Sequence, residues 1–322
     1  MGLWSCEPVV ENVNYEEKLV VFCNLEANLP IARDTVFVTQ SHGIDESHED
    51  NEKWVSGATV EISTGERVFD FREVDELPGR YLCTDSSYVV ESGVVYVLNV
   101  ATEDHEVSAS TEVPGEIRLE SVANDSLWEC EGNTVVEAIN IYPFTLEELF
   151  QWQTTGSGDP AMFRHDTVTY RTADCYTSSF TSMPYFIVHW QTDSEPGIMR
   201  SVTLALEDTV SNVIIDTTFS AHAFKGHMLI DEEGNKYWMN PMVWNFIQRE
   251  IFYGWIAFGY YGLHLIMIQA TDQAFAEYYA GDPLGINQFI APNTNIENGL
   301  GLFSSTTSAA FFVYVAPESP EP

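Results

Sequence analysis

The segment 57–115 alternates apolar and polar residues in short runs. Apolar positions recur at every second residue at Ala58, Val60 and Ile62, and the series Val95, Val97 and Asn99 continues the pattern. Runs of this period that are bounded by Gly, Pro and Asp are typical of half-buried antiparallel strands. The sequence predicts about seven strands, and this number and spacing are typical of an immunoglobulin-like β-sandwich over residues 18–115. The expected strands are 18–25, 34–40, 57–62, 66–71, 79–83, 94–101 and 105–111.

A second, larger β-rich domain is expected over residues 116–316. Three short helices interrupt it: one after the capping box Thr145–Glu148, one from Asn240-Pro241 to about Phe252, and one after Thr271-Asp272. An Asn- and Gly-rich turn at 293–303 precedes the last strand. The fold class is therefore mainly β, with residues 1–17 as a tether and 317–322 as a frayed tail. The expected strands are 117–122, 135–141, 167–172, 186–191, 201–206, 213–219, 262–270 and 309–315.

The charge balance excludes two classes of partner. The 322 residues include 49 acidic and 13 basic ones, which gives a net charge of −36. A nucleic-acid backbone or an anionic membrane surface would be repelled by this charge. A solvated, aggregation-resistant surface and weak cation capture by carboxylates both remain open.

The sequence around Cys6 indicates export. Leu3-Trp4-Ser5-Cys6 is similar to the end of a bacterial lipobox, although Trp4 stands where a small residue is usual. Too few residues precede Cys6 for a signal peptide, so we expect the upstream signal to have been removed or missed. No apolar run is long enough for a spanning helix. Cys6 is thus the candidate lipid anchor and the only expected membrane attachment; an ordinary N-terminal thiol is the alternative.

The other four cysteines divide evenly between the two domains. Cys23 and Cys83 lie on predicted strands of the first domain, whereas Cys130 and Cys175 lie in the second. One disulfide within each domain suits an exported protein. Unpaired buried thiols are the alternative.

Candidate chemistry is sparse. The hydrophilic loop 41–53 contains His42, Asp45, His48 and Asp50, which could bind a metal ion or could simply be solvated. Neither a G-x-S-x-G nor an H-E-x-x-H motif is present, so no catalytic residue is assigned, no cofactor is expected, and the question of an enzyme is left open.

The region that follows residue 236 is rich in aromatic side chains. Aromatic rings offer contact area to a ligand, and amides read its polar groups. We therefore place a candidate site for a polar ligand, such as a glycan or a peptide, on the second domain, with core packing of the rings as the alternative. The candidate residues are Trp238, Trp255, Tyr260, Asn293 and Asn295.

Short motifs in a fixed order resemble the DUF4249 family of exported Bacteroidota lipoproteins. They are Leu19–Phe22, Val55–Val60, Gly79–Tyr81, Gly93–Tyr96, Thr111–Pro114, Gly262–His264, Asp272 with Tyr278-Tyr279, and Asn295–Phe303. The resemblance covers roughly residues 15–315. It implies an outer-membrane lipoprotein, on either face of that membrane, with a non-enzymatic binding or accessory role beside a TonB-dependent receptor or another surface protein. A structural or adhesive surface subunit and a secreted hydrolase of glycans are the alternatives.

Overall fold

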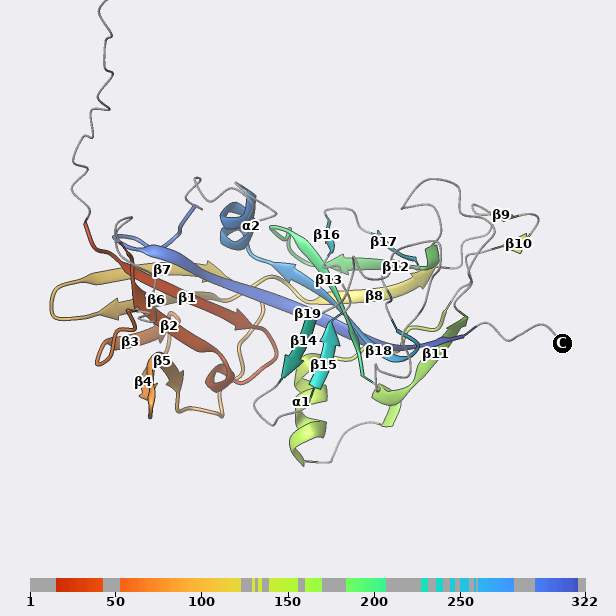
Figure 1. Cartoon of the computed structure of the whole chain (residues 1–322), viewed down its shortest axis with the longest axis horizontal. Helices are drawn as coiled ribbons and strands as arrows, with labels where there is room; N and C mark the ends of the chain where they lie inside the picture. The colour runs from red at the N-terminus through yellow and green to blue at the C-terminus, as the bar shows by residue number, and fades with distance from the viewer. Residues whose placement is uncertain are drawn as a thin grey trace, which may run out of the picture.

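A computed structural model of the chain is mainly β, and its described part contains two α-helices (Figure 1). This confirms the predicted fold class. The described residues are 16–42, 53–122, 129–130, 133–134, 139–155, 160–169, 184–206, 227–230, 236–239, 244–246, 250–254, 258, 260–280 and 293–317.

The seven strands expected in the first part are all present. They lie side by side in the order β1-β2-β5-β4-β3-β6-β7, and a single 3-10 turn at Ile31–Arg33 follows β1. The immunoglobulin-like arrangement of these strands stays a prediction. Their bounds are β1 Leu19–Glu26, β2 Thr35–Gln40, β3 Thr59–Ser63, β4 Val68–Val74, β5 Leu77–Cys83, β6 Val95–Ala101 and β7 Glu106–Glu112.

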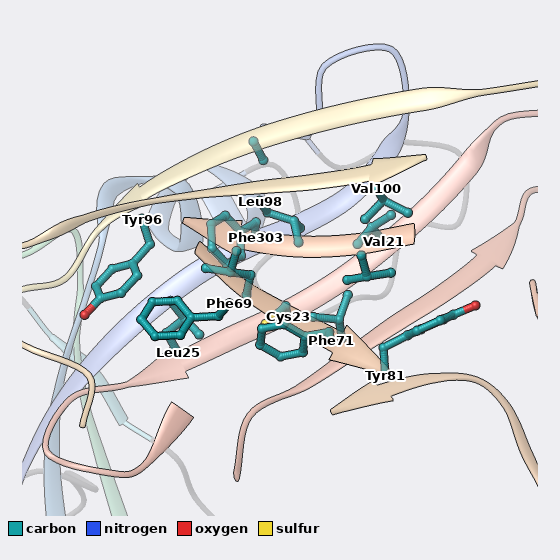
Figure 2. Packing of buried hydrophobic residues seen from close by; sticks show 14 of the residues in the cluster. Val21, Cys23, Leu25, Phe69, Phe71, Tyr81, Tyr96, Leu98, Val100 and Phe303 are labelled. Carbon is teal, nitrogen blue, oxygen red and sulfur yellow. The ribbon is translucent and has the colours of Figure 1, made fainter. Parts of the chain in front are cut away.

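The side of β6 that faces the core is the opposite of the one expected. Tyr96, Leu98 and Val100 are fully buried, whereas Val95 is exposed. The strand is apolar in both phases, so its alternation did not distinguish them, and the bulkier set occupies the core. Figure 2 shows this set packed against side chains of β1, β4 and β5.

Two buried tyrosines lie at opposite ends of this cluster with their hydroxyl groups turned away from it (Figure 2). The Tyr81 hydroxyl donates to the carbonyl oxygen of Val55 at 2.7 Å and accepts from the amide of Ala58 at 3.0 Å. The Tyr96 hydroxyl lies 3.0 Å from that of Tyr88. Each ring therefore fills apolar space while its polar atom is satisfied at the rim of the core.

The strand β19, Leu300–Ala316, runs through the whole molecule (Figure 1). Its first half pairs in parallel with β1, from Val20 opposite Leu300 to Glu26 opposite Thr306. Its second half pairs with β18, Gly262–Thr271, on one side and with β11, His165–Thr169, on the other. The prediction of a strand over 309–315 was therefore too short by nine residues at its start. β19 also contributes Phe303 to the first core, so residues near the end of the chain complete the predicted N-terminal sandwich.

The described strands of the second part belong to three sheets, of which the smallest is the pair β9 and β10. Strands β8, β12 and β17 form another, and β13 pairs with β18, β15 and β16 in the large sheet. Of the expected strands, 117–122, 186–191 and 201–206 are confirmed, residues 139–141 are not in a strand, and 213–219 lie outside the described residues. The bounds are β8 Ile117–Val122, β9 Glu129–Cys130, β10 Asn133–Thr134, β12 Pro184–Thr192, β13 Met199–Ala205, β14 His227–Ile230, β15 Lys236–Met239, β16 Trp244–Phe246 and β17 Glu250–Gly254.

Two of the three predicted helices are confirmed with their caps. α1, Leu146–Thr155, begins after Thr145, whose hydroxyl accepts from the Glu148 amide at 3.2 Å. α2, Gln273–Ala280, begins after Asp272, whose carboxylate accepts from the Phe275 amide at 2.9 Å. Both bonds satisfy amides that have no partner within the helix.

The helix predicted from Asn240 to Phe252 is wrong. Trp244–Phe246 and Glu250–Gly254 are the strands β16 and β17, which pair with β13 and β12. Aromatic and β-branched residues favour strands, and an Asn-Pro pair also begins turns. Within the described residues, no helix is long and apolar enough to cross a membrane.

Candidate functional site

Two phenylalanines lie on the outer surface of the first sheet. In β1 and β2 the inward positions are taken by Val21, Val36 and Val38, which places Phe22 and Phe37 on the solvent side. These two residues are directly opposite each other in the antiparallel pair. Phe22 is 38% exposed and Phe37 is 36% exposed, so two large apolar rings share one open surface.

A tryptophan and an arginine extend this surface on the β2 side. The Trp54 ring lies 6.4 Å from the Phe37 ring, and the Arg80 guanidinium lies 5.9 Å from the centroid of each. Gly79 permits this packing: it has a φ of +71°, and a Cβ there would lie 2.7 Å from the Trp54 ring and 2.5 Å from the carbonyl oxygen of Val38. The Arg80 charge is thus held over two rings in a cation–π arrangement.

Helix α2 extends the surface on the other side. The ring of Tyr278 meets that of Phe22 edge to face, with centroids 6.0 Å apart. Leu302, the β19 partner of Phe22, is buried, whereas Leu300 at the start of the strand is exposed. We call the surface formed by Phe22, Phe37, Trp54, Arg80 and Tyr278 the aromatic face.

The aromatic face avoids acidic residues in a chain that is strongly acidic. The positions of β1 and β2 that are open to solvent on this side contain no Asp or Glu, and Glu26, which lies on the same side at the end of β1, is buried. At the rim, Glu17 is paired with Lys53 at 3.0 Å. Exposed aromatic rings, arginine and a lack of acidic groups are the composition of the centre of a protein–protein interface. The solvent-facing residues in question are Val20, Phe22, Asn24, Thr35, Phe37 and Thr39.

The described residues among those predicted to bind a ligand lie in β15, just before β18 and in the segment before β19. Trp238 lies in β15, opposite Ala205 and Met228, and Trp255 lies outside the described residues. Tyr260 is only 8% exposed, and burial raises the pKa of its hydroxyl. Asn293 is exposed, and its amide donates to the carbonyl oxygen of Glu277 at 3.0 Å.

The side chain of Asn295 is hydrogen-bonded to backbone atoms. Its Oδ1 accepts from the Phe303 amide at 3.0 Å, and its Nδ2 donates to the Phe303 carbonyl oxygen at 2.7 Å. Nδ2 also donates to the Ser110 carbonyl oxygen at 3.3 Å. The side chain therefore takes the place of a neighbouring strand beside β19, and its polar atoms are occupied.

The thiols of Cys23 and Cys83 are both free and buried, so the bridge predicted between them is not formed. β2 lies between their strands. Two interstrand spacings amount to about 10 Å, whereas a disulfide needs Cα atoms within about 7 Å. Burial raises the pKa of both thiols. Cys130 lies in β9; Cys175 and the candidate anchor Cys6 are outside the described residues, so their predicted roles stay predictions.

The histidines of the described part do not gather. His42 follows β2, and its predicted metal-binding companions Asp45, His48 and Asp50 lie outside the described residues. No group of three metal-binding side chains is found in the part that the structure describes. His264 is fully buried in β18, where burial lowers its pKa to about 4.

The first part also has two shallow hollows that share Arg67, with volumes of about 330 and 270 Å³. Arg67 lies over the ring of Tyr88 at 5.3 Å. Neither hollow contains a cysteine–histidine or serine–histidine pair, so neither has the arrangement of a nucleophile with its base.

The fold and the surface define a mainly β protein with an exposed aromatic face. The chain belongs to the DUF4249 family, a domain of unknown function, whose family model matches residues 6–310. The residues missed by sequence reasoning are Phe22 and Phe37. Both lie on the outward side of a strand in which buried and exposed positions alternate, and this alternation could be read from the sequence.

No curated protein matches the chain. Among solved structures it is similar to the one described as "Anomalous substructure of Titin-A168169", with 9% identity and a TM-score of 0.19, over 95% of this chain and 98% of that one. This similarity is too weak to bear on fold or function.

Proposed function

We propose that the protein is an exported, lipid-anchored accessory protein that docks a partner protein through the aromatic face. The observation that carries the proposal is the direct pairing of two exposed phenylalanines, Phe22 and Phe37, on adjacent strands. Exposed apolar patches mark protein–protein contact sites, and aromatic residues and arginine contribute most of the binding energy at such sites.

The partner we favour is an outer-membrane receptor of TonB-dependent uptake. Anchoring at Cys6 would hold the protein at the membrane where such a receptor resides, and the family match begins at that residue. Because this chain is strongly acidic, we expect the partner's docking surface to have basic groups around an apolar centre. Acidic groups at the edge of the partner's surface would be repelled by those of this chain.

The test is site-specific photo-crosslinking in cells that export the protein with its full signal. A crosslinking residue replaces Phe37 in one strain and Val68, which is 63% exposed on β4, in a control strain. We expect an adduct with one outer-membrane receptor from position 37 and none from position 68. Equal adducts from both positions, or none from position 37, would refute docking at this face.

A binding measurement with the receptor so identified gives the magnitude. Truncating a central aromatic residue of an interface typically costs about 1–2 kcal/mol or more, so Phe22→Ser and Phe37→Ser should each weaken binding about tenfold. Val95→Ser, on an exposed position of β6, is the matched control and should bind like the wild type. Detergent-phase partitioning of Cys6→Ala tests the anchor separately: the variant should be released into the aqueous phase.

A further inference from the structure

Two carboxyl groups are buried where β19 passes from the first part of the molecule to the second. Thr306 pairs with Glu26 of β1 on one side and with Thr271 of β18 on the other, so both parts meet at this residue. We call this place the waist. Glu26, the last residue of β1, is 9% exposed, and Asp34, which follows the 3-10 turn, is 7% exposed.

The hydrogen bonds around these two groups are incomplete. The Thr306 hydroxyl donates to Oε2 of Glu26, and the nearby Ser308 hydroxyl lowers the pKa of that carboxyl group. The backbone amide of Glu26 lowers the pKa of the Asp34 carboxyl group. Within the described residues, Oε1 of Glu26 and Oδ2 of Asp34 are buried without a partner. A buried carboxylate oxygen without a donor is costly, whereas a protonated one is neutral and can itself donate.

The charges that face the pair do not neutralise it. The positive charge of Arg200, in β13, lowers the pKa of Glu26, and that of Arg33 lowers the pKa of Asp34. The described ion pairs, Glu17–Lys53 and Arg118–Asp193, lie elsewhere. Arg200 lies over the Phe275 ring at 5.1 Å, and the nearby Tyr279 also acts on it. The thiol of Cys23 faces Asp34 and carries no charge when protonated.

We propose that Glu26 and Asp34 form a pH-sensitive joint: the folded protein holds them protonated, and their ionisation loosens the waist. Burial is the largest cause that raises the pKa of both groups, and the negative charge of Glu26 raises that of Asp34 further. This device is independent of the proposed partner.

The sign of the effect follows from linkage. A carboxyl group whose pKa is raised by folding stabilises the fold below its ordinary pKa, and this stability is lost as the pH rises through the raised value. Each unit by which a pKa is raised changes the unfolding constant about tenfold between those two limits. We therefore expect the waist to weaken on the alkaline side.

The test compares two double variants of equal charge in urea unfolding from pH 5 to pH 8. Glu26→Gln with Asp34→Asn keeps the shape of the joint and removes its titration. Glu112→Gln with Asp70→Asn removes two exposed carboxylates and is the control. The unfolding constant should rise between pH 5 and pH 8 in the control. We expect this rise to be smaller by a factor of at least about ten in the joint variant, Glu26→Gln with Asp34→Asn. Equal pH dependence in the two variants would overturn the proposal.

Three further measurements keep the result decisive. The infrared carbonyl band of protonated carboxyl groups should be stronger in the folded wild type than in the joint variant, which keeps the buried Asp272; equal bands in the two proteins would overturn the proposal. The amide of Ala27 donates to the Thr306 carbonyl oxygen at 2.8 Å and reports on the waist. At pH 8 its hydrogen exchange should be faster in the control than in the joint variant. Stabilisation of the wild type alone by calcium chloride would instead show a cation site and overturn the joint.

Discussion

Replacing Asn295 by an aspartate tests whether its side chain stabilises β19 or is a ligand-binding group. The substitution Asn295→Asp keeps the Oδ1 acceptor for the Phe303 amide but removes the donor to the carbonyl oxygens of Phe303 and Ser110, which lie 2.7 and 3.3 Å from Nδ2. Two lost hydrogen bonds cost about 1 kcal/mol each, and the new carboxylate oxygen lies against a carbonyl oxygen. We expect a loss of about 2–4 kcal/mol in the free energy of unfolding at neutral pH.

The measurement is urea unfolding followed by tryptophan fluorescence, with Asn293→Asp as the control. Asn293 is exposed and makes one bond, so the control adds the same charge at a loss of about 1 kcal/mol or less. When the carboxyl group introduced by Asn295→Asp is protonated, it can again donate to Phe303, so its pKa is raised by folding. The loss should therefore shrink as the pH falls below that raised value. Equal stability of the two variants at neutral pH would refute the structural role and restore Asn295 as a candidate ligand residue.

Three further predictions follow from single positions. Gly301→Ala should abolish cooperative folding, because a Cβ there would lie 2.0 Å from the Val21 carbonyl oxygen, whereas Gly65→Ala, with nothing within 4 Å, should unfold like the wild type. Cys23 and Cys83 should resist maleimide in the folded protein and both react in denaturant; a linked peptide in a non-reduced digest would contradict this. His264 should stay neutral on NMR titration down to about pH 4, since burial lowers its pKa. Because the unfolded form binds this proton nearer pH 6.5, stability from His264 should be lost as the pH falls between the two values.

The strands of the first part could be predicted because their period of two is regular and their turns contain Gly, Pro and Asp. The direction that each strand faces was harder. In β1 only one phase fits a core, with Val21, Cys23 and Leu25 inside, and this leaves Phe22 outside. In β6 both sides of the strand are apolar, and only the packing in the first core, against residues of β1, β4 and β5, selected Tyr96 and Leu98.

The contacts between distant segments could not be predicted. The aromatic face joins β1, β2, β5 and α2, and the sequence separation between Phe22 and Tyr278 hides their contact. The misassigned helix has a similar cause: the caps at Asn240-Pro241 are local signals, whereas β16 and β17 are stabilised by partners far away in sequence. Tertiary pairing overrides local propensity in such cases.

The first half of β19 was missed because its composition is that of a loop. Residues 304–308 are Ser, Ser, Thr, Thr and Ser, and all five are buried. A buried run of hydroxyl groups is stable only if each has a partner, and the partners come from the strands that meet at the waist. Ser304 donates to the Asn24 side chain, and Thr307 donates to the Pro114 carbonyl oxygen at 2.6 Å.

These hydroxyl groups explain how one strand can serve two cores without slipping. An apolar strand that is buried on both faces tolerates a shift of register by two residues, since one aliphatic side chain replaces another. A shift of the polar run by two residues would instead bring Leu302 and Phe303, or Ala309 and Ala310, against polar partners at one of its ends and leave those buried partners unsatisfied. Ser305 binds both the Thr111 hydroxyl at 2.6 Å and the Glu112 carbonyl oxygen at 3.2 Å, so it fixes β19 against the end of β7. Thr306 does the same against the end of β1. The polar run therefore sets the register of the longest strand at the point where the two parts of the molecule meet.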